Sequence, residues 1–392
     1  MGNRGRRRST RTVAYREDPT VASRVKKQQA QTQPEDVSAP VSRSNTQPEI
    51  LSIRWKKPQG PVVIQYADGS RYEGDVDENE LRHGAGVYIV RVGHVFKGAW
   101  VHGFFEGFGS QTFAGTGDCH EGMYRKNHRH GVGTYLWANG DKYVGNWRVG
   151  KMHGVGTFFW KNGDSYDGEW KRGVMHGKGK KVFSSGETID GAWRHNLVSG
   201  WGIKTFSSGD RYEGYFVKGE REGFGKYEWV GGDTHEGTWH QGLMHGRGVY
   251  VSTEGSLHGT WVNGELNGPG VQYFRCGSIY TGEFKVSERS GVGTLAFASG
   301  ETYDGEWLKG EIQGYGSWSS PDGRKYIGMW AHGSPSGRGI FCREHEEEDR
   351  DDENQSNNIA EAQPPFEFGV FKRGRLKSSG KHFFIERVII PS

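Results

Sequence analysis

The chain has 392 residues, of which 64 are glycine and 12 are proline, and 13% are aromatic. This much glycine without a three-residue period, together with scarce proline, excludes a collagen-like helix and a proline-rich linker, and favours short strands joined by tight turns. The 51 basic and 47 acidic side chains give a formal net charge of +4, too small for the whole chain to act as a nucleic-acid-binding polycation.

Cysteine usage and hydropathy predict an intracellular protein. Cys119, Cys276 and Cys342 are too widely separated for a zinc ribbon or a disulfide framework. No segment approaches the roughly 18 to 20 apolar residues of a membrane span, and the N-terminus lacks the apolar core of a secretory signal. Myristoylation after Met1 is disfavoured because Arg6 stands where Ser or Thr is expected. We expect the cytoplasm and the cytoskeleton.

Residues 1–50 are rich in Arg, Ser, Gln and Pro and nearly free of aromatic side chains, so they are predicted to be a disordered tail. Between Arg4 and Lys27 the positive charge is opposed only by Glu17 and Asp18. The tail is therefore a candidate binding site for an acidic surface, through Arg6, Arg7, Arg8, Arg11, Lys26 and Lys27.

A repeat occupies residues 72–342, and residues 51–71 resemble a partial repeat that caps its N-terminal end. The clearest signature is aromatic-x-Gly-x-aromatic, and successive central glycines are 22 to 24 residues apart. Twelve units are readable, with central glycines Gly74, Gly98, Gly122, Gly145, Gly168, Gly191, Gly214, Gly237, Gly259, Gly282, Gly305 and Gly328.

Two further signals recur in each unit. A Gly-x-Gly element, often preceded by His, follows about ten residues later, as in His153-Gly-Val-Gly156. An Asn-Gly-Asp or Ser-Gly-Asp/Glu element, such as Asn139-Gly140-Asp141, then closes the unit. Asn-Gly and Ser-Gly supply the positive φ of a two-residue hairpin turn, so we expect a turn of that type there.

Each unit is predicted to be one β-hairpin. Residues i, i+2 and i+4 of a strand share a face, so the two aromatic rings flank a gap left by the glycine, which rings of a neighbouring unit can cover. A lone hairpin is marginal, so the units must stack. The predicted fold is all-β: an elongated, twisted antiparallel β-solenoid, or meander, of about twelve hairpins, on the order of 110 Å long.

These units resemble the MORN repeat (membrane occupation and recognition nexus), over about residues 62–341. Some units depart from the pattern at the first aromatic place, which holds His120, Ile189, His235 or Leu257, and these are expected to pack less tightly. After the repeats, residues 343–364 are predicted to be an acidic disordered loop, and residues 365–392 a C-terminal strand cap.

No catalytic residue, metal site or cofactor is predicted. The Gly-x-Gly pairs lack the strand, loop and helix setting of a phosphate cradle. Equivalent histidines of adjacent units lie about 10 Å apart by strand spacing, too far to share one ion, so a turn-stabilising or surface role is favoured. Carboxylates such as Asp167 and Glu169 recur in many units, which favours a solvated face over a catalytic pair.

The expected binding site of the array is a groove lined by its aromatic rings, represented by Tyr143, Trp147, Tyr166, Trp170, Tyr303, Trp307, Tyr326 and Trp330. The expected occupant is another protein, either a helix or a second MORN array. Homodimerisation stays open, and no nucleic-acid partner is expected.

The resemblance to MORN-only proteins implies a non-catalytic scaffold in a cytoskeletal assembly, with the ciliary or flagellar axoneme as the leading place, as in radial spoke heads. The alternative is a peripheral membrane adaptor, in which the basic tail and the sheet surface bind anionic phospholipids.

Overall fold

The computed structural model describes residues 50–54, 61–342 and 366–376. The chain divides into two units, residues 1–49 and residues 50–392. The predicted basic tail and the predicted acidic loop therefore lie outside the described residues, apart from Ile50 at the tail's last position.

The described residues of the second unit form 28 strands and contain no helix. The strands are β1 Ile50–Arg54, β2 Val62–Tyr66, β3 Arg71–Val76, β4 Arg82–Ile89, β5 Val95–Val101, β6 Phe104–Thr112, β7 Cys119–Arg125, β8 His128–Leu136, β9 Lys142–Arg148, β10 Lys151–Phe159, β11 Ser165–Lys171, β12 Val174–Val182, β13 Thr188–Arg194, β14 Leu197–Thr205, β15 Arg211–Val217, β16 Glu220–Glu228, β17 Thr234–His240, β18 Leu243–Ser252, β19 Gly255–Val262, β20 Glu265–Phe274, β21 Ile279–Lys285, β22 Glu288–Ala296, β23 Thr302–Leu308, β24 Glu311–Ser319, β25 Lys325–Ala331, β26 Ser334–Cys342, β27 Phe366–Lys372 and β28 Arg375–Leu376.

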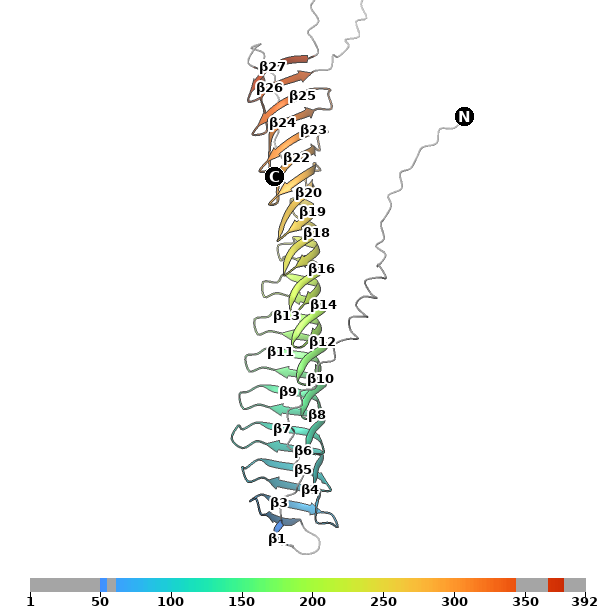
Figure 1. The fold of residues 1–392 in the computed structure, drawn as a ribbon, viewed down its shortest axis with the longest axis vertical. Coiled ribbons are helices and arrows are strands. Elements are labelled where there is room, and N and C mark those ends of the chain that lie inside the picture. The colour runs from blue at the N-terminus through green and yellow to red at the C-terminus, as the bar shows by residue number, and fades with distance from the viewer. Residues whose placement is uncertain (1–49, 55–60, 343–365, 377–392) are drawn as a thin grey trace, which may run out of the picture. The chain divides into compact units, whose positions relative to one another are not determined.

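Each strand pairs antiparallel with the next strand in the chain, so all described strands form one open meander. This order is visible in Figure 1, where the colour changes steadily along the stack from β3 to β27. Most repeats contribute a seven-residue strand followed by a nine-residue strand, as in β9 and β10. The predicted all-β meander of stacked hairpins is confirmed.

A row of glycines crosses the sheet from one strand to the next. Gly145 is the register partner of Gly156, which in turn pairs with Gly168, and the row runs unbroken from Gly74 to Gly339 and on to Gly369. The tyrosine two residues before the central glycine lies over this row. A Cβ added to Gly156 would lie 2.3 Å from the hydroxyl oxygen of Tyr143. Glycine is therefore required for the ring to lie against the backbone.

The tyrosine hydroxyl is satisfied within its own strand. In the repeat of β9, the Tyr143 hydroxyl donates a hydrogen bond to the carbonyl oxygen of Asn146 at 3.0 Å. Tyr143 has no solvent exposure, and a buried hydroxyl without such a partner would cost free energy of roughly 1 to 3 kcal/mol. The contact allows a polar aromatic side chain to fill the core.

In most repeats a tryptophan two residues after the central glycine connects the repeat to the preceding one. Trp170 packs edge-on against Tyr143 of the preceding repeat, with ring centroids 5.5 Å apart, and against its own Tyr166 at 5.2 Å. Its indole N–H donates to the carbonyl oxygen of Gly156 at 2.8 Å. Edge-to-face aromatic pairs contribute about 0.5 to 1.5 kcal/mol beyond their buried area. Stacking is therefore stabilised by packing and by a hydrogen bond.

In most repeats the two strands are joined by a two-residue turn with positive φ at both positions, as at Val149 (49°) and Gly150 (74°). This is the type I′ geometry favoured in hairpins. The predicted two-residue turn at Asn139-Gly140 is wrong. Here Trp137 and Asp141 are joined by a backbone hydrogen bond of 2.9 Å around three residues, of which Gly140 has positive φ. That connection is the three-residue type, which needs one left-handed residue.

The closing aspartate has a role that links repeats. The Asp164 carboxylate accepts a hydrogen bond from the backbone N–H of Ser184, 20 residues later, at 2.9 Å. This bond lowers the pKa of Asp164. Asp141 and Asp210 accept the equivalent bonds from Lys161 and Val230. The third sequence signal is therefore a contact between the loops of adjacent repeats.

Both ends of the sheet continue the repeat. β2 places Val62 opposite Gly74, at the start of the glycine row. At the other end, β27 places Gly369 opposite Gly339, and Phe371 packs edge-on against Tyr326 with centroids 5.0 Å apart. Within residues 366–376, the predicted C-terminal cap is thus the first hairpin of a further, divergent unit.

The glycine row gives a direct test. Gly156→Ala should destabilise the array by about 1 to 3 kcal/mol, because the added methyl group would overlap the fixed Tyr143 ring. Gly231→Ala is the matched control, since its Cβ would meet nothing within 4 Å, and we expect a change within about 0.5 kcal/mol. Urea unfolding followed by circular dichroism measures both, and equal midpoints would contradict the assignment.

Candidate interaction surface

The eight aromatic residues expected to line an open groove are core residues. All of them are at most 5% exposed, and they pack edge-on against one another along the array. In the described residues these rings therefore do not line an open groove, because they are packed against one another and buried. Partner binding through these rings stays a prediction. The basic residues Arg6, Arg7, Arg8, Arg11, Lys26 and Lys27 lie outside the described residues.

Arginines enter this inner face at some repeats. The Arg221 guanidinium lies 4.6 Å from the Trp239 ring centroid, and one of its N–H groups donates to the carbonyl oxygen of Gly242 in a turn. Burial lowers the pKa of Arg221. Arg82, Arg129 and Arg289 make the equivalent hydrogen bonds to Gly103, Gly150 and Gly310. These arginines stabilise turns by cation–π contact and hydrogen bonding.

Two histidines occupy the buried tyrosine place. His120 is 1% exposed and His235 has no exposure, so the expected looser packing is wrong at both. His235 lies edge-on between Trp239 and Trp261, with centroid distances of 5.4 and 5.0 Å. Burial lowers the pKa of His235 to about 4, and burial with nearby Arg129 lowers that of His120 to about 3. Both rings are neutral at pH 7.

The recurrent His before Gly-x-Gly occupies a place where side chains stabilise the turn of the next repeat. Glu106 accepts a hydrogen bond there from the Lys126 backbone N–H at 2.7 Å, and Asn267 accepts one from Val286 at 3.0 Å. His83 Nδ1 lies 3.5 Å from the His102 backbone nitrogen. Among the described residues, however, the buried Nδ1 atoms of His176 and His245 have no hydrogen-bond partner, so the turn-stabilising role of the recurrent histidine stays a prediction.

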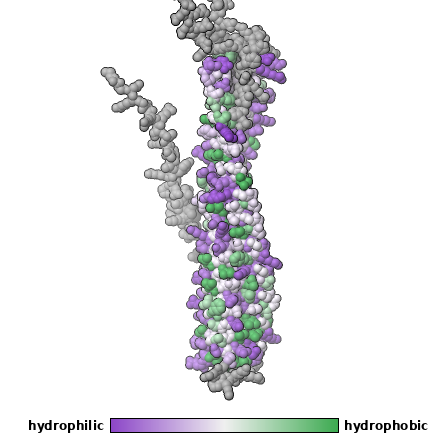
Figure 2. Space-filling model, turned by 180° about the vertical axis from the view of Figure 1, so that it is seen from behind, coloured by the Kyte–Doolittle hydropathy of each residue, from purple (hydrophilic) through white to green (hydrophobic). Residues whose placement is uncertain are grey.

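The opposite, outer face of the sheet carries the side chains that differ most between repeats. The residue between the two glycines of Gly-x-Gly projects away from the tyrosine core. This position holds exposed Val132, Val155, Trp201, Phe224, Val292 and Tyr315, but Lys178 and Arg247 in other repeats. On the face seen in Figure 2, hydrophobic residues likewise gather in separate patches between hydrophilic ones.

One group of outer-face side chains, which we call the central aromatic cluster, consists of Trp201, Tyr215 and Phe224. They stand on the successive strands β14, β15 and β16 and are 46%, 51% and 49% exposed. Trp201 is the register partner of Tyr215, and their rings meet edge-on with centroids 5.2 Å apart. Large aromatic side chains this exposed are typical of binding surfaces.

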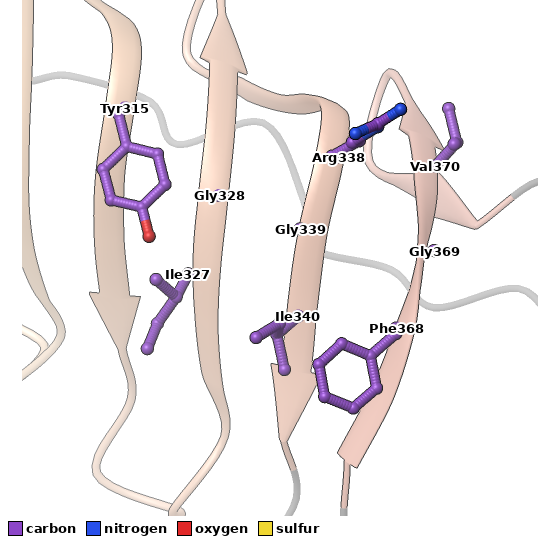
Figure 3. A pocket seen from close by; sticks show the side chains of 9 residues that line it. All are labelled: Tyr315, Ile327, Gly328, Arg338, Gly339, Ile340, Phe368, Gly369 and Val370. Carbon is purple, nitrogen blue, oxygen red and sulfur yellow. The ribbon is translucent and has the colours of Figure 1, made fainter.

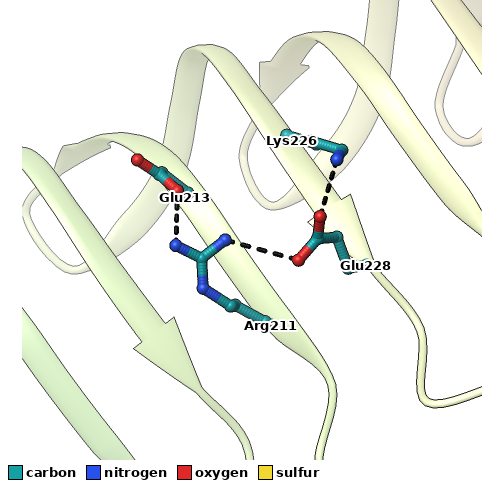
Figure 4. Close-up of polar contacts among 4 residues, drawn as sticks. All are labelled: Arg211, Glu213, Lys226 and Glu228. Carbon is teal, nitrogen blue, oxygen red and sulfur yellow. Dashed lines mark hydrogen bonds and ion pairs between the residues drawn. The ribbon is translucent and has the colours of Figure 1, made fainter.

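A polar network borders the central aromatic cluster. Arg211 forms ion pairs with Glu213 and with Glu228, and Glu228 also pairs with Lys226 at 2.6 Å (Figure 4). Arg211, Glu213 and Tyr215 alternate along β15, so their side chains project to the same face. The arrangement of an aromatic centre beside a charged border matches the anatomy of protein interfaces.

A second outer-face feature, which we call the terminal hollow, lies across β24 to β27. It has a volume of about 440 Å³. Tyr315, Ile327, Ile340 and Phe368 project to one side of four successive strands, beside Arg338 and Val370 (Figure 3). The hollow is mainly apolar, with one basic side chain at its border.

The comparisons with known proteins identify the repeat. The family model described as the MORN repeat matches ten segments that together make up more than half of the chain: residues 96–115, 120–142, 143–165, 166–188, 212–234, 235–257, 258–278, 280–302, 303–323 and 326–343. The structure continues the same strand pairing through residues 189–211, which the family model does not match. A search of curated proteins found no match.

Similar solved structures share only a low overall likeness. The SAS-4 (dCPAP) TCP domain of Drosophila melanogaster, solved with a proline-rich motif of Ana2 (dSTIL), is 11% identical, with a TM-score of 0.25, over 42% of this chain and 83% of that one. The TCP10 domain of Danio rerio CPAP, with a STIL peptide, is 10% identical, with a TM-score of 0.16, over 70% and 92%. At these scores the likeness carries no inference about binding. The described residues include no helix able to cross a membrane.

The buried histidines predict an acid-sensitive array. The pKa of His235 is lower in the folded chain than the usual value near 6.5, so its stabilising effect is complete above pH 6.5 and is lost as the pH falls toward 4. From pH 7.5 to pH 5 the loss is on the order of 2 kcal/mol.

We expect His235→Tyr to reduce this loss, because tyrosine fills the same place in other repeats and does not bind a proton in this range. Urea unfolding at the two pH values measures the difference. The exposed His128→Gln variant should keep the wild-type pH dependence. An unchanged pH dependence in His235→Tyr would contradict the burial argument.

Proposed function

This chain belongs to the MORN repeat family, and on that premise we propose that it is a non-catalytic scaffold that binds other proteins in a cytoskeletal assembly. MORN repeats are non-enzymatic modules that bind proteins or membranes. We favour a protein partner over a membrane because of the central aromatic cluster and its charged border.

The two faces of the sheet have different roles: the inner face stabilises the array, and the outer face is the proposed binding surface. Tyr and Trp recur on the inner face of almost every repeat and are buried, so they stabilise the stack and leave little surface for a partner. Trp201, Tyr215 and Phe224 come together in one place on the outer face. Since a few aromatic anchors usually supply most of the binding energy of an interface, this cluster is the proposed anchor.

A protein partner agrees better with this surface than a lipid bilayer does. Arg211 and Lys226 are each within ion-pair distance of a glutamate, so the cluster's border offers little uncompensated positive charge. Attraction to anionic lipids depends on such charge. The membrane adaptor becomes the better account if the protein sediments with anionic vesicles in a salt-sensitive manner.

The assembly we propose to test first is the ciliary axoneme, because MORN-only arrays resemble radial spoke head components. In a ciliated cell, tagged protein should stay with the axoneme after detergent extraction and leave it only at high salt. Release from the cell cortex by detergent alone would contradict the cytoskeletal proposal.

The central aromatic cluster should be required for this retention. The double variant Trp201→Ser/Phe224→Ser should shift the protein into the detergent-soluble fraction, with at least about tenfold less retained, because two interface anchors are lost. The matched control, Val155→Ser/Val292→Ser, alters the same outer position where no aromatic cluster exists. Thermal unfolding establishes that both variants are folded. Equal retention of both variants would show that the central aromatic cluster is not part of the binding surface.

A further inference from the structure

Three metal-ligating side chains meet at the N-terminal end of the array. Asp77 directly follows β3, His83 lies in β4, and His102 stands in the two-residue turn between β5 and β6. One candidate ligand atom from each lies within 4.8 Å of the others. They belong to different positions of neighbouring hairpins, so the distance between equivalent histidines of adjacent repeats does not apply to them.

The Asp77 carboxylate is held in place by its own turn. Its Oδ1 accepts hydrogen bonds from the backbone N–H groups of Asn79 and Leu81, both at 2.9 Å. Its Oδ2 faces His102, whose Nδ1 lies 2.7 Å away. One oxygen is therefore fixed by the backbone while the other points at the imidazole, which is how a ligating carboxylate is commonly oriented.

The two imidazoles lie side by side. The ring centroids of His83 and His102 are 5.1 Å apart, and the rings are inclined at 57°. The side chain of His102 is 65% exposed, whereas that of Asp77 is 8% exposed. The outer imidazole is thus free to adjust over a nearly fixed carboxylate.

The surrounding charge favours a cation. Glu78 and Glu80 stand in the same turn as Asp77. The nearest basic residue in the sequence, Arg82, is directed to the opposite face, where its guanidinium lies 4.2 Å from the Tyr88 ring centroid and donates to the Gly103 carbonyl oxygen. Within the part of the chain that the structure describes, the His102 imidazole is the one basic group in contact with the Asp77 carboxylate.

We propose that Asp77, His83 and His102 form a binding site for a divalent transition-metal ion of the Zn²⁺ class. Two imidazoles and one carboxylate are ligands that Zn²⁺ accepts, and an open fourth position would be taken by water. To admit the ion, the Asp77–His102 pair must open from 2.7 Å to about 3.3 Å, since zinc bonds to nitrogen and oxygen are about 2.0 to 2.2 Å long. Rotation of the exposed His102 side chain supplies this movement.

Comparison with another repeat shows what distinguishes this set of side chains. His332 occupies the turn place of His102, and its Nδ1 lies 2.9 Å from a carboxylate oxygen of Glu311. At the place of His83, however, this repeat has Gln313, which lies at 3.4 Å from the His332 backbone nitrogen. Among the described residues, only the set at Asp77 brings three such ligands together. A bound ion would join two consecutive hairpins at this end of the sheet.

The test is titration of the full chain, without a histidine tag and after treatment with a chelator, with ZnCl₂ in a calorimeter. We expect one ion per chain in the wild type and no binding at this site in His83→Gln or His102→Asn. Both substitutions use residues found at the equivalent places in other repeats, Gln313 and Asn263, so the turns are preserved. His332→Asn is the matched control and should bind as the wild type does.

A second measurement identifies the ligands. Co²⁺ in place of Zn²⁺ should give the visible absorption of a tetrahedral site in the wild type and in His332→Asn, and lose it in Asp77→Asn. Thermal unfolding without metal, unchanged among the variants, separates loss of ligands from loss of fold. Absence of binding to the wild type, or equal binding to His83→Gln, would overturn the proposal.

Discussion

The structure depends on the close approach of a tyrosine ring to two paired glycines. Without a Cβ on Gly145 and Gly156, the ring of Tyr143 lies against the backbone and its hydroxyl reaches a carbonyl of its own strand. The adjacent repeat then covers that ring with Trp170. Because the core of one repeat is completed by the next, a single hairpin is not a stable unit, and stability accumulates along the stack.

This constraint divides the sheet into a face that repeats and a face that varies. Most inner positions hold aromatic rings, Ile189 and Leu257 take the tyrosine place in two repeats, and His120 and His235 are accommodated there as buried, neutral imidazoles. The outer positions have no such requirement, so they hold valine, lysine, arginine or tryptophan in different repeats. Features that occur once, such as the central aromatic cluster, are therefore located on the outer face or in the turns.

The turns show how a local departure from the repeat creates a distinct site. The place of His83 holds a capping side chain in some repeats, as with Glu106 and Asn267, and histidine in several others. Here the facing turn also holds a histidine and Asp77 lies beside both, so three potential metal ligands come together. Asp77 stands at a longer β3–β4 connection, in which Asp77 and Leu81 are joined by a backbone hydrogen bond around three residues. The glycine row still runs through the pairing of β3 to β6.

The sequence alone determined the hairpin repeat, its family and the common face of Tyr143 and Trp147, because strand alternation and glycine spacing are local properties of the chain. It did not determine that these rings are buried from solvent, because the neighbouring repeats cover them. It also misplaced the two-residue turn at Asn139-Gly140, because the choice between turn types depends on strand register. Stacking alone brought Trp201 beside Tyr215, and Asp77 beside His102, residues whose separation in the chain reveals no contact.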